Sequence, residues 1–264
     1  MKSLLFPALL KYWRARRGLS QLDLALEANV SARHVSFLES GRAQPSEEMV
    51  LRLASVLAMP LRNQNEVLRA AGFSARYDEA PFAELSAEVD AALRQMMTEH
   101  EPFPLTVLAS DTTILQMNRG AARLFQAFSA EPLGTAPLDM LSLVFDPRYL
   151  RTSALDWDAL ARSMLSRLHR ANLARGGDPK LTEKLERVFA DPAIPKSWRL
   201  PDFSKPIAPT LTVRLRRGDL EVGFLVTATV FSAPQHVTLD ELLIESSFPL
   251  DAKTREVCAR LALG

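Results

Sequence analysis

The sequence has little of the residue types that build disulfides, metal sites and membrane spans. It contains one cysteine, Cys258, and four histidines that lie far apart in the chain. One cysteine excludes an internal disulfide and fits a reducing compartment, and scattered histidines argue against a structural zinc or iron site. No stretch reaches the roughly eighteen uncharged apolar residues of a transmembrane helix. Residues 1–7 lack the order of regions of a signal peptide, so we expect a cytoplasmic protein with no membrane partner.

Enzyme motifs are missing as well. We find no nucleophile elbow, phosphate-binding loop, metal cluster or pair of carboxylates at catalytic spacing, and therefore predict neither an enzyme nor a bound cofactor. With 264 residues, 47% of them hydrophobic and 24% charged, the chain has the composition of a folded protein with one large domain or two modest ones.

Charge is distributed unevenly along the chain. Residues 1–76 carry eleven Lys or Arg and six Asp or Glu, whereas the whole chain has a formal net charge of only +1. A basic module joined to a mildly acidic one suggests that only the first binds a polyanion. A solvated surface produces the same modest excess, so the motifs must decide between these two readings.

The first third of the chain reads as a series of short helices. Ser20, Ser31 and Ser46 are good N-cap residues, because a serine hydroxyl accepts a hydrogen bond from the first turn of a helix. Asn29 and Gly41 stand where a tight turn and a C-cap need a positive φ. We therefore predict helices over about residues 9–16, 20–28, 31–40, 46–57 and 62–71.

The run SQLDLALEANVSARHVSFLESGR, residues 20–42, resembles the helix-turn-helix of the Xre/Cro-type repressor family. Matching features are the Ser-Gln opening, a Leu-Ala pair, the Val-Ser start of the second helix, the Leu-Glu-x-Gly-Arg end, and the Pro-Ser that follows. Ala25 must be small because two helices joined by a short turn approach closely there. Val30, Val35 and Leu38 are expected in the core of the bundle.

The resemblance implies that the helix beginning at Ala32 enters the major groove of duplex DNA. In the family, residues at the positions of Ala32, Arg33 and Phe37 face base edges. Arg33 is the best candidate for a bidentate guanine contact, and Phe37 either contacts a thymine methyl group or belongs to the core. Phosphate contacts are expected from Gln21 and Arg42. The predicted set is completed by Ser31, His34 and Ser36.

Two further features of the motif concern its stability and its partners. Arg14 and Glu39 match a pair that forms an intramolecular salt bridge in this family, and we prefer that role to DNA contact. One such domain makes few contacts, and repressors of this kind read two half-sites about 34 Å apart as dimers. We therefore expect a homodimer, whose interface is either the amphipathic helix predicted over residues 83–99 or the C-terminal domain. The alternative for residues 83–99 is a linker helix packed on a neighbour.

Beyond residue 102 the pattern changes from helical to mixed. Short strand-like runs, a helix, two further helices and a final group of strands follow one another, which predicts an antiparallel sheet with helices over one face. The predicted strands cover about residues 105–109, 113–117, 210–216, 221–231 and 242–246, and the helices about residues 118–128, 156–175 and 181–189.

This second region resembles the ligand-binding domain of MmyB-like transcription regulators, a PAS-like fold that follows an Xre-type domain. The matching segments are ILQMNRGA at 114–121, LVFDP at 143–147, Trp157 before a long helix, and PLD at 249–251. The resemblance implies a small molecule held between the sheet and its covering helices, and a fatty acid is the ligand it suggests.

The predicted ligand site is apolar. We expect it to be formed by Leu105, Val107, Leu115, Met117, Asn118, Leu124, Phe125, Phe145, Trp157, Leu160, Met164 and Leu168. Taken singly, each apolar residue is more typical of a plain core than of a ligand site, and Asn118 is at least as well placed to cap a helix as to bind a ligand. A carboxylate ligand needs a cation, for which Arg123, Arg148, Arg151 and Arg199 are the candidates. A lone histidine, His169, does not support haem.

Together these features predict a two-domain α+β protein. A five-helix helix-turn-helix domain would cover residues 1–75, a connecting helix residues 76–102, and the PAS-like domain residues 103–264. The predicted function is a transcriptional regulator whose operator binding responds to an apolar small molecule. The alternative is a repressor whose C-terminal domain only dimerises or binds a protein.

Overall fold

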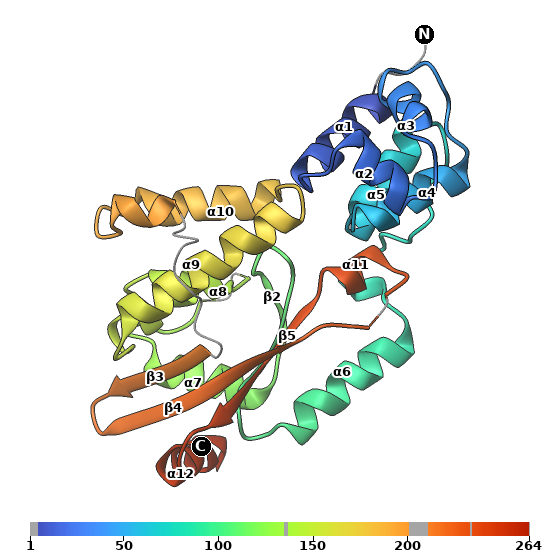
Figure 1. Cartoon of the computed structure of the whole chain (residues 1–264). Helices are drawn as coiled ribbons and strands as arrows, with labels where there is room; N and C mark the ends of the chain where they lie inside the picture. The colour runs from blue at the N-terminus through green and yellow to red at the C-terminus, as the bar shows by residue number, and fades with distance from the viewer. Residues whose placement is uncertain (1–4, 135–136, 201–210, 233, 264) are drawn as a thin grey trace. The chain divides into compact units, whose positions relative to one another are not determined.

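The computed structural model describes residues 5–134, 137–200, 211–232 and 234–263. The chain forms two compact units, each with its own core (Figure 1). The first contains residues 1–80 together with residues 233–240, and the second contains residues 81–232 and 241–264. The predicted boundaries at 75 and 102 differ from this division. Residues 81–102 belong with the second unit, and residues 233–240 return to the first.

The first unit is all-helical, as predicted. Its main helices are α1 (Leu5–Arg16), α2 (Gln21–Glu27), α3 (Ala32–Glu39), α4 (Glu47–Val56) and α5 (Leu61–Ala70). Ser20, Ser31 and Ser46 cap α2, α3 and α4, each accepting a hydrogen bond from a backbone N–H three residues later. Asn29 has a φ of 54°, which allows the tight turn from α2 to α3.

The core of this unit is built from the apolar faces of all five helices. Trp13, Leu24, Leu38 and Leu53 are among its fully buried side chains. Ala25 is 1% exposed, as expected where α2 and α3 approach closely. Burial of large apolar side chains is the main source of stability for so small a unit.

A short helix, α11 (Val237–Asp240), also belongs to the first unit although it lies between two strands of the second in the sequence. Val237 is fully buried. This helix was not predicted, because four residues are too few to show a helical period.

The second unit combines a sheet with helices. Its strands are β1 (Leu105–Leu108), β2 (Ile114–Met117), β3 (Leu211–Arg217), β4 (Leu220–Thr229) and β5 (Leu243–Pro249). Its helices of six residues or more are α6 (Ala87–Glu99), α7 (Arg119–Phe128), α8 (Met140–Phe145), α9 (Trp157–Ala174), α10 (Pro179–Ala190) and α12 (Ala252–Leu263). The strands and long helices match the predicted ranges closely, and α8 and α12 were not predicted. Thr210, the predicted start of the third strand, lies outside the described residues.

The five strands form one antiparallel sheet in the order β2-β1-β5-β4-β3. The last strand in sequence is therefore central, between β1 and β4. Helices α8, α9 and α10 share a cluster of buried apolar side chains on one side of this sheet (Figure 1). This confirms the predicted α+β class and the two-domain organisation. Within the described residues, no helix is long and apolar enough to cross a membrane.

Candidate functional sites

The first candidate site is helix α3, which the sequence identifies as the recognition helix. Its buried residues, Val35 and Leu38, lie on one face. Arg33 is exposed on the opposite face, and Phe37 is half-buried and lies outside the set of buried core residues. The structure thus presents Phe37 on the outer surface of the helix, where a ring can contact a thymine methyl group.

The ring of Phe37 organises two arginines beside it. The guanidinium carbon of Arg33 lies 5.1 Å from the centre of the ring, and that of Arg42 lies 5.9 Å from it. Such cation–π contacts restrict the positions of long side chains that otherwise move freely. The backbone N–H of Arg42 also donates to the carbonyl oxygen of Phe37 at 2.9 Å, which fixes the chain just after α3.

A buried ion pair attaches α3 to the rest of the unit. Arg14 Nε and Nη2 donate to the two carboxylate oxygens of Glu39 at 2.6 and 3.0 Å, and Arg14 Nη1 donates to the carbonyl of Leu19. Burial by itself raises the pKa of Glu39, but hydrogen bonds from Arg14 and Gln21 outweigh it, so the pKa lies below its usual value. The geometry agrees with the intramolecular role expected for this pair.

Gln21 has a second partner that the sequence did not reveal. Its side-chain Nε2 donates to Glu39 Oε2 at 2.7 Å. This bond uses one of the two amide hydrogens and orients the side chain at the N-terminus of α2. The N–H of Asp23 donates to Ser20 Oγ and that of Leu24 to the carbonyl of Ser20, so the groups available to a phosphate at this helix N-terminus are the other amide hydrogen of Gln21 and the backbone N–H groups of Gln21 and Leu22. Ser31 is occupied as the cap of α3, while Ala32, His34 and Ser36 are half-buried on α3.

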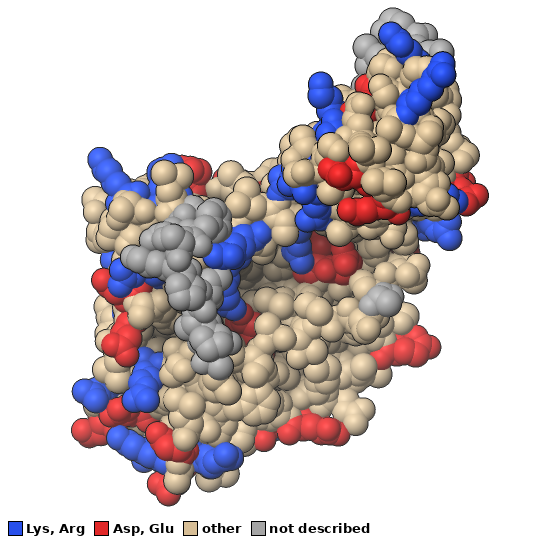
Figure 2. Space-filling view, viewed as in Figure 1, with Lys and Arg blue, Asp and Glu red and all other residues tan. Residues whose placement is uncertain are grey.

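On the visible face of the first unit, positive charge is not gathered in one continuous block. On the face seen in Figure 2, its Lys and Arg side chains form separate groups with Asp and Glu side chains between them. On this face the positive charge is therefore divided among acidic side chains, so the motif rather than the bulk charge identifies α3 as the candidate surface.

The second candidate site is a cavity in the other unit, between one face of the sheet and helices α7, α8 and α9. Its volume is about 80 Å³. The sheet contributes side chains that alternate along β3 and β4, among them Val213, Leu215, Phe224 and Val226. Because directly paired residues of antiparallel strands point to the same face, the pairing of Val213 with Phe224 explains why both line the cavity.

Four of the twelve predicted ligand residues line this cavity, namely Leu124, Phe125, Leu160 and Met164. The two strand residues Leu105 and Val107 do not line it. On β1 it is Thr106 that faces the cavity, and alternate residues point to the opposite face. All four residues of β1 are buried, so their hydrophobicity does not reveal which face they occupy.

Three helix residues account for half of the other differences. Phe145, Trp157 and Leu168 pack into the cluster between α8, α9 and α10, which shares Leu160 and Met164 with the cavity wall. The indole N–H of Trp157 donates to the carbonyl of Val144 at 2.8 Å, which fixes the ring away from the cavity. The remaining two, Leu115 and Met117, are half-buried on β2 and do not line it.

Asn118 has a structural role. Its Oδ1 accepts hydrogen bonds from the backbone N–H groups of Ala121 and Leu105, and its Nδ2 donates to the carbonyl of Phe103. It therefore caps α7 and ties that helix to β1, which settles the alternative in favour of the cap. Two residues on, a Cβ on Gly120 would lie 2.4 Å from the carbonyl oxygen of Pro102, so only glycine fits there.

The four arginines suggested for a ligand carboxylate all have other partners. Arg123 donates to the carbonyl of Leu261, Arg148 pairs with Asp146, Arg151 with Asp191, and Arg199 with Glu186. None of them lines the cavity.

The arginine that does line the cavity is Arg167, on α9, together with Glu245 on β5. Sequence reasoning missed both residues, although a sign of Arg167 was present. Leu160, Met164 and Arg167 follow one another at helical spacing, so an arginine occupies a core-facing position of an amphipathic helix. The ring of His169 stacks on Phe189, and burial lowers its pKa.

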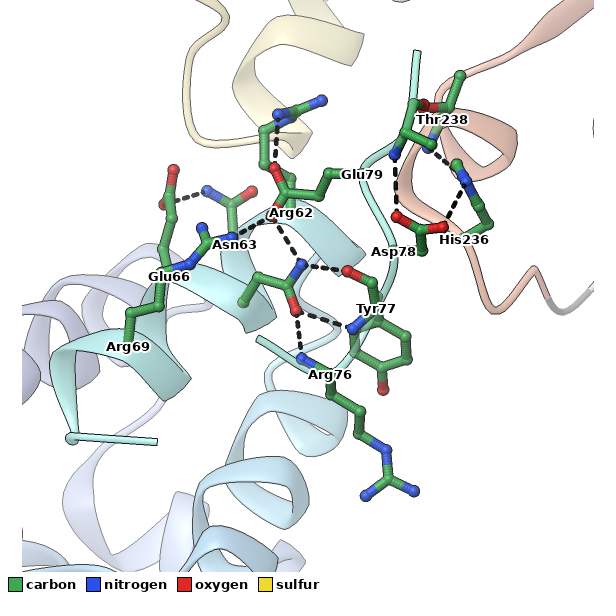
Figure 3. Close-up of polar contacts among 12 residues, drawn as sticks. Arg62, Asn63, Glu66, Arg69, Arg76, Tyr77, Asp78, Glu79, His236 and Thr238 are labelled. Atoms are coloured by element: carbon green, nitrogen blue, oxygen red, sulfur yellow. Dashed lines mark hydrogen bonds and ion pairs between the residues drawn. The ribbon is translucent and has the colours of Figure 1, made fainter. Parts of the chain in front are cut away.

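A third feature is a set of hydrogen bonds within the first unit, which contains residues 1–80 and 233–240. Buried Asn65, on α5, accepts hydrogen bonds from the backbone N–H groups of Arg76 and Tyr77, and donates to the carbonyl of Tyr77 and to Glu79 (Figure 3). Arg69 pairs with the same carboxylate at 2.7 Å. All the hydrogen-bonding capacity of this amide is thus used to hold residues 76–79 against α5.

Helix α11 is added to this network from the other side (Figure 3). The N–H of Val237 donates to the carbonyl of Asp78 at 2.8 Å, and the hydroxyl of Thr238 donates to the carbonyl of Ala80 at 2.6 Å. Asp240 accepts a hydrogen bond from the N–H of Leu61, at the start of α5. Since Pro60 provides no side-chain cap, Asp240 supplies one from a distant part of the chain.

These features define a transcription regulator made of a DNA-binding unit and a ligand-binding unit. A helix-turn-helix family model matches residues 10–62, and the model of the MmyB-like transcription regulator ligand binding domain matches residues 89–261. The second match covers most of the chain, which therefore belongs to the MmyB-like transcription regulator family. No curated protein matches the chain significantly.

Proposed function

We propose that this regulator binds its operator as a homodimer through α3, and that an apolar small molecule such as a fatty acid controls the binding. Arg33 reads a guanine, Phe37 contacts a thymine methyl group, and Gln21 and Arg42 hold the phosphate backbone. The exposed position of Arg33 beside the ring of Phe37 supports these roles.

Ligand control is supported by the path of the segment that contains α11 and connects β4 to β5. Strands β4 and β5 both line the cavity, through residues such as Val226 and Glu245. The segment that connects them includes Asp240, which caps α5 of the DNA-binding unit. Only four residues separate Asp240 from Glu245, so a ligand that shifts β5 acts on a short, direct covalent connection.

Cavity size sets a condition on this proposal. A volume of about 80 Å³ is smaller than the engineered cavity of about 150 Å³ that holds one benzene molecule. A fatty acid therefore enters only if the walls separate. The free energy for that change comes from burying its chain, at about 0.8 kcal/mol for each methylene group. Coupling of this kind, in which binding requires a change of conformation, is what a ligand-controlled regulator needs.

The test has two stages. Native mass spectrometry of the full chain, followed by extraction of bound lipid, identifies a ligand and gives the number of subunits. Selection of bound DNA from a random pool, with and without the extracted lipid, then gives the operator and the effect of the ligand. A dimer without bound lipid, whose DNA affinity no fatty acid changes, would establish the alternative of a repressor that has no small-molecule effector.

A further inference from the structure

The polar end of the cavity contains one cation and one anion. Among the described residues that line it, only Arg167 and Glu245 are charged. Arg167 Nη1 and Glu245 Oε1 lie 3.6 Å apart, which is longer than a normal hydrogen bond. The side chain of Glu245 is only 12% exposed, and burial raises the pKa of this carboxyl group despite the nearby guanidinium.

Arg167 keeps hydrogen-bonding capacity that the described protein does not use. Arg167 Nε is buried and has no hydrogen-bond partner there. Buried N–H groups are nearly always paired in proteins, so an unpaired guanidinium hydrogen at a cavity wall indicates a place for an acceptor. Glu245 Oε1 lies farther from Arg167 Nη1 than a hydrogen bond requires, and a carboxylate can accept a hydrogen bond from a further donor.

Among the described residues, no other charged group lines this end of the cavity. The residues paired with Glu245 on the neighbouring strands are Thr106 on β1 and Ala228 on β4. The described residues that line the cavity from α7, α8, β3 and β4 are uncharged, and from α9 Arg167 is the charged group that faces the carboxylate. With Glu245 ionised the pair is therefore neutral as a whole, and a third charge placed beside it has no counterion among the described residues that line the cavity.

We infer that the cavity binds an apolar molecule with one head group that both donates and accepts a hydrogen bond, and that the complex carries no net charge. The acceptor of the head group meets Arg167 and its donor meets Glu245. This inference rests on the proposed function, since it describes the ligand of that site. A carboxylic acid satisfies it only if one proton is shared between the acid and Glu245.

The prediction separates ligands of the same length by charge. Octanamide is neutral with donor and acceptor, octanoate is an anion, methyl octanoate has acceptors only, and octyltrimethylammonium is a cation. Binding of each to the full chain is measured by calorimetry from about pH 6 to about pH 9, a range in which a free carboxylic acid is ionised. Once Glu245 is ionised, octanamide binds with a dissociation constant that does not change with pH, and the ester and the cation bind at least tenfold more weakly.

The binding of octanoate tests directly whether one proton is taken up with the ligand. Once Glu245 is ionised in the free protein, its binding takes up one proton, so the dissociation constant rises about tenfold for each pH unit. Calorimetry of octanoate binding to wild-type protein, repeated in two buffers of different ionisation enthalpy, also measures the number of protons taken up. In Glu245→Gln, which keeps the size of the side chain, octanoate binds as the anion with no pH dependence, and Arg167→Met weakens octanamide and octanoate alike.

Two results would overturn the inference. In the first, octanoate binds wild-type protein without proton uptake and more tightly than octanamide over the whole pH range. Arg167 would then bind the ligand carboxylate as an anion, with no proton shared with Glu245. Failure of all four probes to bind would remove the proposed small-molecule function as well, so the two failures are distinguishable.

Discussion

The surface of α3 and the cavity beneath α9 differ in how their polar groups are satisfied. In the described part of the first unit, buried polar side chains have partners, as Asn65 and Glu39 show. The buried side-chain atoms without a partner among the described residues all lie in the second unit: Thr112 Oγ1, Gln116 Oε1, Ser129 Oγ, Arg167 Nε and His169 Nε2.

This difference corresponds to two kinds of target. Duplex DNA is a large, fairly regular target, and a helix that reads it benefits from side chains fixed in advance by a satisfied network. A small molecule inside a protein must instead provide the missing hydrogen bonds and apolar contacts itself. The first unit is therefore expected to lose function through loss of rigidity, and the second through loss of particular ligand contacts.

The largest effect is expected from breaking the ion pair behind α3. Arg14→Met leaves Glu39 as a buried carboxylate without its cation and should destabilise the first unit by about 3–5 kcal/mol. Arg52→Met, which removes an exposed i,i+4 pair with Glu48, should cost less than about 1 kcal/mol. Urea unfolding followed by helical circular dichroism measures both, and equal losses would contradict the role assigned to Arg14.

The same pair gives a pH dependence. Because the pKa of Glu39 is lowered in the folded state, its contribution to stability is complete above the unfolded pKa of about 4.3 and is lost as the pH falls through the folded pKa. The loss in wild-type protein should therefore begin below about pH 5 and be smaller in Arg14→Met. Urea midpoints at a series of pH values test this, and parallel curves for the two proteins would contradict it.

The next effect concerns base recognition rather than folding. Arg33→Ala should weaken operator binding by about 1–3 kcal/mol and relax the preference at one base pair, because a bidentate contact is lost. Arg42→Gln should weaken all sequences alike and reduce the salt dependence by about one phosphate contact. Binding to a library of single-base operator variants distinguishes them, and an unchanged base preference in Arg33→Ala would exclude it as a reader.

A smaller effect is expected at α11. Asp240→Ala removes the side chain that caps α5 and should destabilise the first unit by about 1 kcal/mol, whereas Asp240→Asn keeps an acceptor and should restore most of the loss. Thermal unfolding of the full chain measures both variants. If neither changes the unfolding of the DNA-binding unit, the segment between β4 and β5 does not support it, and the proposed route of ligand control fails.

The sequence predicted what depends on neighbouring residues. Ser20, Ser31 and Ser46 give the starts of three helices because a cap acts within one turn, and the pairing of Arg14 with Glu39 followed from a resemblance to known proteins. Helix α12 was missed although Asp251 accepts a hydrogen bond from the N–H of Thr254, a capping pattern that is readable in the sequence.

What the sequence could not predict depends on residues far apart in the chain. Glu245 reaches Arg167 only because β5 inserts between β1 and β4, and strand order is not written in local hydrophobicity. The same applies to Val237, whose burial depends on a return of the chain to the first unit after more than 150 residues. Leu105 and Val107 were assigned to the wrong face because a strand buried on both faces shows no alternation.

The smallest predicted effect tests whether the network behind α3 is separate from base reading. Gln21→Ala removes one hydrogen bond to Glu39 and one phosphate donor, so DNA binding should weaken by about 1 kcal/mol, equally for every sequence. Gln21→Glu should weaken it further, because a second carboxylate then faces both Glu39 and the phosphates. Fluorescence anisotropy with operator and random DNA gives both affinities. A change in the ratio of the two in Gln21→Ala would mean that the rigid network itself determines which bases are read, and that the fixed surface of α3 is more than a support for Arg33.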